Sequence, residues 1–198
     1  MKILRIVLTG EEPPYYTITK AFQKHFEVDT YYWDEFVDLR YLNEVIQARV
    51  RAYKYDVVFM QIQKAGIITT DTAKVLASNV PLIFNWTGDV RKNIEWFYEL
   101  GPYMITLFTN MEDVNTMRAD GLRADYLQTG YDHLYYYNQN FPRKRISFCG
   151  NFYDDMDFPL TNQRVHMVKK MIDIFPEFDL YGANWQKIGI KSSGFINN

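Results

Sequence analysis

Carboxylates stand in the loops that follow two of the predicted strands. Glu11 lies in the loop after a first strand at residues 3–8, and Asp89 lies in the loop after a fourth strand at residues 81–86. The carboxyl edge of a parallel sheet is where open α/β folds bind ligands, and a carboxylate there can deprotonate an acceptor hydroxyl. We therefore take Asp89 and Glu11 as the candidate catalytic bases. Two simpler interpretations stay open, with Asp89 as the N-cap of the next helix and Glu11 as part of a solvated turn.

Four further residues are candidates for binding substrate. Gly10 lies in the first of these loops and Gly88 in the second, where a glycine lets the backbone approach a ligand closely. Gln61 ends the third predicted strand, and its amide can both donate to and accept from a sugar hydroxyl. His133 adjoins a Gly-x-Asp turn. An alternative fits Gln61 and His133 equally well, namely that they are exposed polar residues that bind no ligand.

These loops require a scaffold in which strands and helices alternate, and the first 130 residues have that pattern. Apolar or β-branched runs predict strands at residues 3–8, 28–33, 55–61, 81–86, 104–108 and 124–128. Helical patterns lie between them, at residues 17–26, 34–53, 70–77, 91–100 and 111–119. Asp34 and Thr70 are the predicted N-caps of the second and third helices. The fold class is therefore α/β, with a Rossmann-like doubly wound parallel sheet.

A second domain begins after a change in composition. Residues 131–145 are rich in Tyr and Asn and have no periodicity, which is typical of an interdomain linker. The pattern then restarts, with strands at 146–149 and 178–181 around a helix at 162–175. We expect residues 1–130 to form the first domain and 146–198 to begin a second Rossmann-like domain. Because about fifty residues cannot bury such a core, we expect this domain to be incomplete and the chain to continue past Asn198. We therefore expect residues 1–198 alone to be inactive as an enzyme. The alternative is that the short segment packs on the first domain.

Composition excludes several classes of protein. The net charge is −2, and the longest basic run is Arg143-Lys144-Arg145, so neither nucleic acid nor an anionic membrane is the expected partner. A single cysteine, Cys149, excludes a disulfide framework and a cysteine-based zinc site. The first apolar run is too short for a signal peptide or a membrane span, which predicts a cytoplasmic protein. The acidic residues at 154–157 lack the spacing of a calcium loop, so no metal is implied.

Two segments resemble a known family. Residues 107–137 (LFTNMEDVNTMRADGLRADYLQTGYDHLYYY) resemble the end of the N-terminal domain in GT-B-fold glycosyltransferases, where a Gly-x-Asp turn leads to the second domain. Residues 146–185 (ISFCGNFYDDMDFPLTNQRVHMVKKMIDIFPEFDLYGANW) resemble the start of the donor domain in the CgeB-like, glycosyltransferase family 1-like group. In that group a strand ends in Gly-Asn, an FP-small-x-x-R segment opens a helix, and a strand ends in YG-x-x-W. The resemblance stops within the donor domain, before the part that makes most donor contacts.

The resemblance implies a donor site in the second domain. Gly150 and Asn151 would approach the donor diphosphate, where backbone N–H groups and the following helix N-terminus favour an anion. Arg164 in that helix would add positive charge, or else it lies on a solvated helix face.

The function that the resemblance implies is transfer of a sugar from a nucleotide-sugar donor to a hydroxyl of a glycan, protein or small-molecule acceptor. The nucleotide-sugar is a co-substrate, and no other cofactor is expected. The 16 Tyr and 14 Phe could line a sugar cleft or fill an aromatic core. The alternative is a non-catalytic Rossmann-like binding or scaffold protein derived from a glycosyltransferase. A nicotinamide or flavin enzyme is disfavoured because no G-x-G-x-x-G loop follows the first strand. The choice between a monomer and a homodimer stays open.

Overall fold

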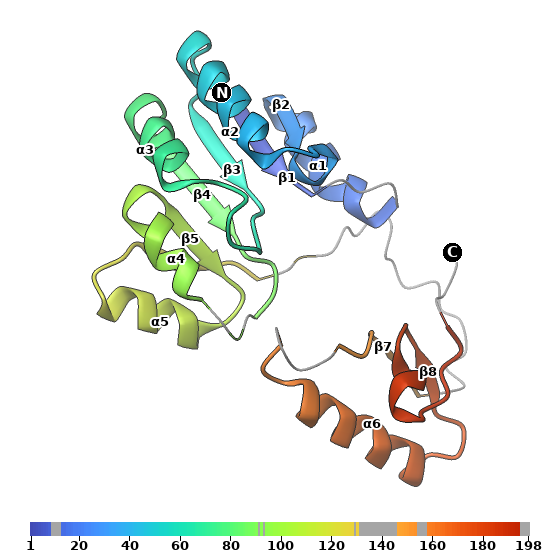
Figure 1. The fold of residues 1–198 in the computed structure, drawn as a ribbon. Helices are drawn as coiled ribbons and strands as arrows, with labels where there is room; N and C mark the ends of the chain where they lie inside the picture. The colour runs from blue at the N-terminus through green and yellow to red at the C-terminus, as the bar shows by residue number, and fades with distance from the viewer. Residues whose placement is uncertain are drawn as a thin grey trace. The chain divides into compact units, whose positions relative to one another are not determined.

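The chain forms two compact units, one built on a six-stranded sheet and the other on a two-stranded sheet (Figure 1). The structure is a computed structural model and describes residues 1–8, 13–90, 92, 94–128, 130, 146–153 and 158–194. The predicted linker at 131–145 lies outside the described residues. Each unit is described here by itself.

The first unit is an α/β domain with a parallel sheet, as predicted. Its strands, within the described residues, are β1 (Lys2–Val7), β2 (Glu27–Tyr32), β3 (Val57–Met60), β4 (Leu82–Trp86), β5 (Ile105–Phe108) and β6 (Ala124–Tyr126). Their order in the sheet is β2-β1-β3-β4-β5-β6, and each neighbouring pair is parallel. The chain therefore leaves β1 toward one side for β2 and returns to the other side for β3. This reversal creates the topological switch point of a doubly wound sheet.

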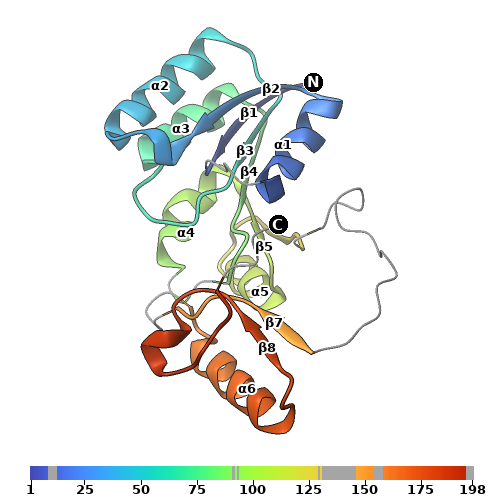
Figure 2. The ribbon, with the colours of Figure 1, turned by 90° about the vertical axis from the view of Figure 1, so that its right-hand side faces the viewer.

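Helices cover both faces of this sheet. They are α1 (Pro13–His25), α2 (Leu39–Ala52), α3 (Thr70–Asn79), α4 (Glu95–Leu100) and α5 (Met111–Ala119), with short 3-10 helices η1 (Trp33–Glu35) and η2 (Gly101–Tyr103). Helix α1 lies on one face, and α2 and α3 lie on the other (Figure 2). Alternate side chains of β1 serve the two faces, because Leu4 and Ile6 pack in the core under α2 and α3 while Ile3 and Val7 pack under α1. Burial on both faces explains why this strand is mostly apolar.

The two predicted helix N-caps differ from those in the structure. The predicted helix at 34–53 is interrupted, because η1 ends at Glu35 and α2 begins at Leu39. Asp38, and not Asp34, is the N-cap, with its carboxylate accepting from Arg40 N at 2.8 Å. Thr69, one residue before the predicted cap, caps α3 by accepting from Thr72 N at 3.2 Å. In both cases a side-chain oxygen close to the predicted position satisfies the free N–H groups of the first turn.

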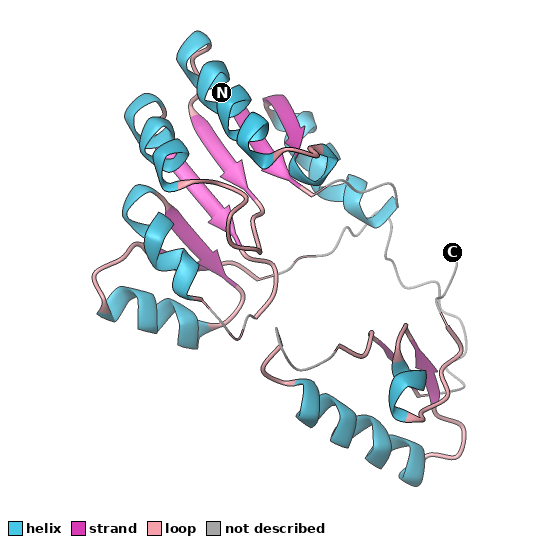
Figure 3. Ribbon diagram, in the orientation of Figure 1, coloured by secondary structure: helices cyan, strands magenta, loops and turns pink. Residues whose placement is uncertain are grey.

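The second unit is a strand–helix–strand segment with a short extension (Figure 3). Strands β7 (Ser147–Cys149) and β8 (Asp179–Tyr181) are parallel, helix α6 (Thr161–Ile174) connects them, and a 3-10 helix η3 (Trp185–Ile188) follows. Its small core contains five buried side chains, namely Phe152, Val168, Leu180, Trp185 and Ile190. The chain after η3 folds back on β8, because Ser193 N donates to Leu180 O at 2.8 Å. No helix in the described part of either unit is both long and apolar enough to cross a membrane.

Candidate functional site

The carboxyl ends of β3 and β4 form the edge where the predicted site residues gather. The loop after β3 is anchored by Asn85, a side chain of β4 that is 1% exposed. Its Oδ1 accepts from Ile62 N at 2.9 Å, and its Nδ2 donates to Ile62 O at 3.2 Å. The Asn85 side-chain amide therefore bonds both the N–H and the C=O of Ile62, as the backbone of a neighbouring strand would. Ile62 is fully buried in the core, so this loop has a fixed position.

The amides of Gln61 and Gln63, on either side of Ile62, converge on Gly88. A Cβ placed on Gly88 would lie 2.6 Å from Gln63 Nε2 and 3.7 Å from Gln61 Nε2. Gly88 has a φ of +70°, a conformation that glycine adopts without strain. The structure thus brings two predicted substrate residues, Gln61 and Gly88, together, and it adds Gln63 to them. Neutral amides that both donate and accept match the hydrogen-bonding needs of hydroxyl groups.

Two neighbouring side chains complete this edge of the sheet. Trp33 Nε1 donates to Gln61 O at 3.2 Å, which joins the end of β2 to the amide cluster. Thr87 is fully buried, and its Oγ1 has no hydrogen-bond partner among the described residues. Neither residue was a candidate from sequence, because a tryptophan and a threonine beside apolar strands carry no signal of their own.

Asp89 is exposed in the loop directly after Gly88. The N-cap of α4 is Ile94, so the alternative interpretation of Asp89 as the cap of that helix is wrong. The helix begins at Glu95 instead of near 91. Glu11, Gly10 and His133 lie outside the described residues.

An open pocket of about 760 Å³ lies in the segment between β2 and α2. Phe36 and Tyr41 contribute aromatic rings whose centroids are 6.2 Å apart, and Tyr41 is 59% exposed. Three carboxylates, those of Glu35, Asp38 and Glu44, also line it. An exposed ring beside hydrogen-bond acceptors is a surface on which a pyranose can stack.

In the second unit, the predicted donor loop is held by internal hydrogen bonds. Gly150 O accepts from Trp185 Nε1 at 2.7 Å, and Asn151 Oδ1 accepts from Ala183 N at 2.8 Å. Arg164 Nη1 donates to Asn151 O at 3.0 Å. The Gly-Asn and YG-x-x-W segments are therefore two halves of one structural contact. Their spacing in the sequence reflects packing of the loop after β7 against the loop after β8.

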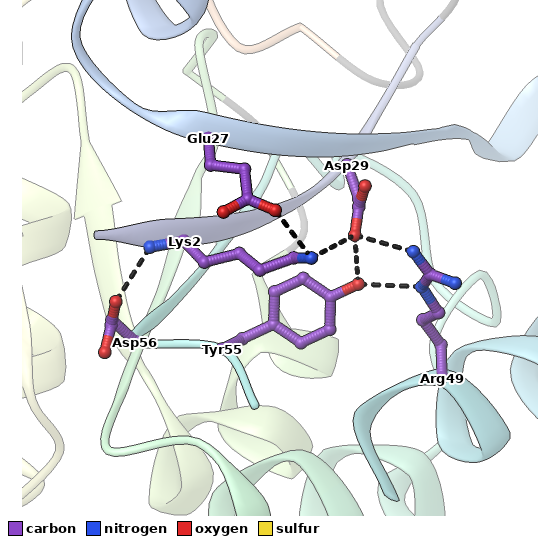
Figure 4. Close-up of polar contacts among 6 residues, drawn as sticks. All are labelled: Lys2, Glu27, Asp29, Arg49, Tyr55 and Asp56. Atoms are coloured by element: carbon purple, nitrogen blue, oxygen red, sulfur yellow. Dashed lines mark hydrogen bonds and ion pairs between the residues drawn. The ribbon is translucent and has the colours of Figure 1, made fainter. Parts of the chain in front are cut away.

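The opposite, amino-terminal edge of the first sheet contains a network of charged groups (Figure 4). Asp29 accepts hydrogen bonds from the Tyr55 hydroxyl and from Arg49 Nη2, the latter at 2.8 Å, and Lys2 Nζ lies 3.6 Å away. Burial raises the pKa of the Asp29 carboxyl, but the hydrogen bonds from Tyr55 and Arg49 outweigh it and lower the pKa. Burial, followed by the bond to Asp29, raises the pKa of Tyr55. Each charge has an opposite partner here, so we assign the network to stability and not to ligand binding.

Tyr55→Phe is expected to destabilise the first unit by about 2 kcal/mol at neutral pH, since a hydrogen bond to a half-buried charged acceptor is lost. Folding raises the Tyr55 pKa, so the folded state holds the phenol proton more tightly than the unfolded state. This stabilisation is complete below the unfolded pKa of about 10 and declines as the pH rises above it. Urea unfolding at several pH values between 8 and 11.5 measures how steeply the free energy of unfolding falls with pH. We expect this slope to be smaller in Tyr55→Phe than in the wild type. Tyr98→Phe is the control. The bond from Tyr98 to Asp120, at 2.7 Å on the surface, also raises the pKa of Tyr98, but Tyr98 is more exposed than Tyr55, so this variant should flatten the slope less. Equal slopes in the two variants would contradict the assignment.

The described residues contain no group of three or more His, Cys, Asp and Glu side chains placed to hold a metal ion. No protein-family model matches this chain, and no curated protein matches it in sequence.

Proposed function

We propose that this protein is a GT-B-type glycosyltransferase that moves a sugar from a nucleotide-sugar donor to an acceptor hydroxyl. The convergence of Gln61 and Gln63 on Gly88 is the observation that carries the proposal. A neutral, hydrogen-bonding cluster at the carboxyl edge of a doubly wound sheet suits hydroxyl-rich ligands. The exposed Tyr41 ring beside the carboxylates of its pocket provides a second surface on which a sugar ring can stack.

In this proposal the first unit binds the acceptor, and the second unit belongs to the part of the protein that binds the donor. Asp89 removes the proton from the attacking hydroxyl if the reaction inverts the anomeric centre. In a retaining reaction the donor phosphate takes that role. Gly150, Asn151 and Arg164 approach the donor diphosphate. The protein acts in the cytoplasm and needs no cofactor beyond the nucleotide-sugar.

The second candidate is a non-catalytic binding or scaffold protein, and the donor loop favours it. Gly150 N donates to Tyr181 O at 2.9 Å, and Arg164 is engaged by the carbonyl of Asn151. Groups that would hold a diphosphate are thus already used in holding the fold. Such a protein would bind a saccharide at Gln61 and Gly88 without turning over a nucleotide-sugar.

A panel of nucleotide-sugars separates the two candidates. The full-length protein is incubated with UDP-, GDP- and dTDP-linked hexoses, release of nucleoside diphosphate is measured, and saturation-transfer NMR detects binding of free saccharides. Release of diphosphate that saturates with donor supports the transferase. Saccharide binding without release supports the binding protein, and absence of both overturns both candidates.

A further inference from the structure

The two edges of the first sheet differ in how their outward backbone groups are used. Strand β6 forms one edge, and Leu127 N, just beyond it, donates to a carbonyl of β5 at 2.8 Å. Because alternate residues of a parallel strand bond the same neighbour, Ala124 and Tyr126 face outward. Arg118 Nε donates to Ala124 O, and Asp125 Oδ1 accepts from Tyr126 N, both at 2.9 Å. Side chains of the same unit therefore occupy part of this edge.

Strand β2 forms the other edge of the sheet (Figure 1). Glu27 N donates to Met1 O at 3.2 Å, so the backbone of Glu27 bonds the β1 side. By the same alternation, the backbone groups of Asp29 and Tyr31 also bond β1. The outward-facing residues are the other three, Val28, Thr30 and Tyr32. In the described part of the chain no hydrogen bond reaches their backbone N–H and C=O groups, so a complete row of donors and acceptors is open to another strand.

Nothing in the sequence of β2 opposes a further strand. Natural edge strands are protected by being short, by a bulge, or by a lysine or proline. β2 has six residues (EVDTYY), contains neither lysine nor proline, and pairs with β1 through an unbroken register. Its two carboxylates are paired with cations of the same unit, Glu27 with Lys2 and Asp29 with Arg49, each at 2.8 Å. The valine, threonine and tyrosines favour a strand, so β2 is suited to pairing on its outer side.

A second copy of β2 matches this row in antiparallel register, about a two-fold axis perpendicular to the sheet. With the axis at Thr30, Thr30 faces its own copy and Val28 faces the partner's Tyr32, so every outward N–H meets a C=O. Asp29 then lies opposite the partner's Tyr31, and no carboxylate faces another. An axis at Asp29 would instead oppose two carboxylates, which is destabilising, and would leave Tyr32 without a partner in the strand.

We propose that the protein forms a homodimer in which β2 pairs with β2 of a second copy, joining the two six-stranded sheets into one. Such an isologous contact uses the same row of groups on both copies. Because the paired strands are antiparallel, the carboxyl edges that carry Gln61 and Gly88 lie at opposite edges of the joined sheet. The contact does not depend on sugar transfer, so the two proposals stand or fall separately.

Amide hydrogen exchange of the full chain tests the contact without a variant. In the dimer the amides of Val28, Thr30 and Tyr32 are bonded, whereas in the monomer they are free. We expect their exchange to slow by about tenfold or more between dilute and concentrated protein, because association follows mass action. The amides of Asp29 and Tyr31, which bond β1 in both states, should change far less.

Light scattering measures the mass of the same particle. We expect the mass of two chains for the wild type and of one chain for Thr30→Pro, which removes the N–H at the two-fold axis. Proline is tolerated on an edge strand where the N–H faces outward. Tyr126→Pro is the matched control, because it places a proline at an outward position of the opposite edge, and it should remain a dimer.

The outcomes separate the second copy from other occupants of this edge. Slow exchange of the outward amides at every concentration, in a particle of two chains, supports a tight dimer. The same slow exchange in a particle of one chain would overturn the proposal, because another segment of the protein would then cover β2. Fast exchange at every concentration, or a Thr30→Pro variant that stays dimeric, would overturn it as well. If Thr30→Pro does not fold, the exchange of the wild type decides alone.

Discussion

Gly182→Ala is expected to unfold the second unit. The new Cβ would lie 2.1 Å from the carbonyl oxygen of Gly150 and 2.5 Å from its carbon. These are backbone atoms, and the same oxygen accepts the indole N–H of Trp185, so it cannot move away without breaking that bond. Gly182 also has a φ of +129°, which an alanine rarely adopts. We expect a cost above about 4 kcal/mol, comparable with the whole stability of a unit whose residues contribute roughly 0.05–0.15 kcal/mol each.

The Trp185 indole provides the measurement. Its Nε1–H is buried and bonded, so in the folded unit it should exchange slowly with deuterium, and in Gly182→Ala it should exchange at the rate of a free tryptophan. Gly189→Ala is the matched control. Gly189 has a φ of +73° but no atom within 4 Å of the added Cβ, so only backbone strain of about 1–2 kcal/mol applies. Equal protection of Trp185 in both variants would show that the contact with Gly150 does not hold the unit together.

Local sequence signals predicted the fold of the first unit well. The bounds 111–119 of α5 agree with the prediction, because both ends are marked by nearby residues. Asn110 caps the start by accepting from Asp113 N at 2.8 Å, and Gly121 lies just beyond the end with a φ of +78°. The start of α2 was misplaced because Trp33 donates to Gln61 O, a contact with a distant loop that favours the separate 3-10 turn.

The candidate site was only partly predictable, since its residues depend on tertiary contacts. Because the carboxyl ends of parallel strands lie at one edge of the sheet, Gln61 and Gly88 were predicted to lie at the same edge. The structure brings them together there. Asn85 stands inside an apolar strand pattern, and its partner Ile62 is 23 positions away in sequence, so nothing local indicates its role. Arg5 was read as part of an apolar strand buried on both faces. That assignment of burial is confirmed, because Arg5 is 2% exposed.

Asp89→Asn is expected to lower the rate of sugar transfer by about 100- to 10,000-fold, the range that a general base contributes. Asp89 follows Gly88 at the carboxyl end of β4, beside the amides proposed to hold the acceptor. An asparagine keeps the size of the side chain but cannot accept the proton of the attacking hydroxyl. The loss should therefore appear in kcat, while KM for the acceptor, which reflects Gln61 and Gln63, changes little.

The control for loss of one negative charge is Asp71→Asn, in the first turn of α3, where the carboxylate is 85% exposed and faces Lys74. Initial rates of nucleoside diphosphate release with and without acceptor separate transfer from hydrolysis. If the rate of nucleoside diphosphate release falls only in Asp89→Asn, and only when acceptor is present, Asp89 is the base of an inverting reaction. If both variants turn over as fast as the wild type, no carboxylate at Asp89 is needed, and the proton passes to the donor phosphate as in a retaining enzyme. In that case the product must keep the anomeric configuration of the donor, which NMR reads from the anomeric coupling constant. An inverted product would contradict both Asp89 as the base and the proposed mechanism.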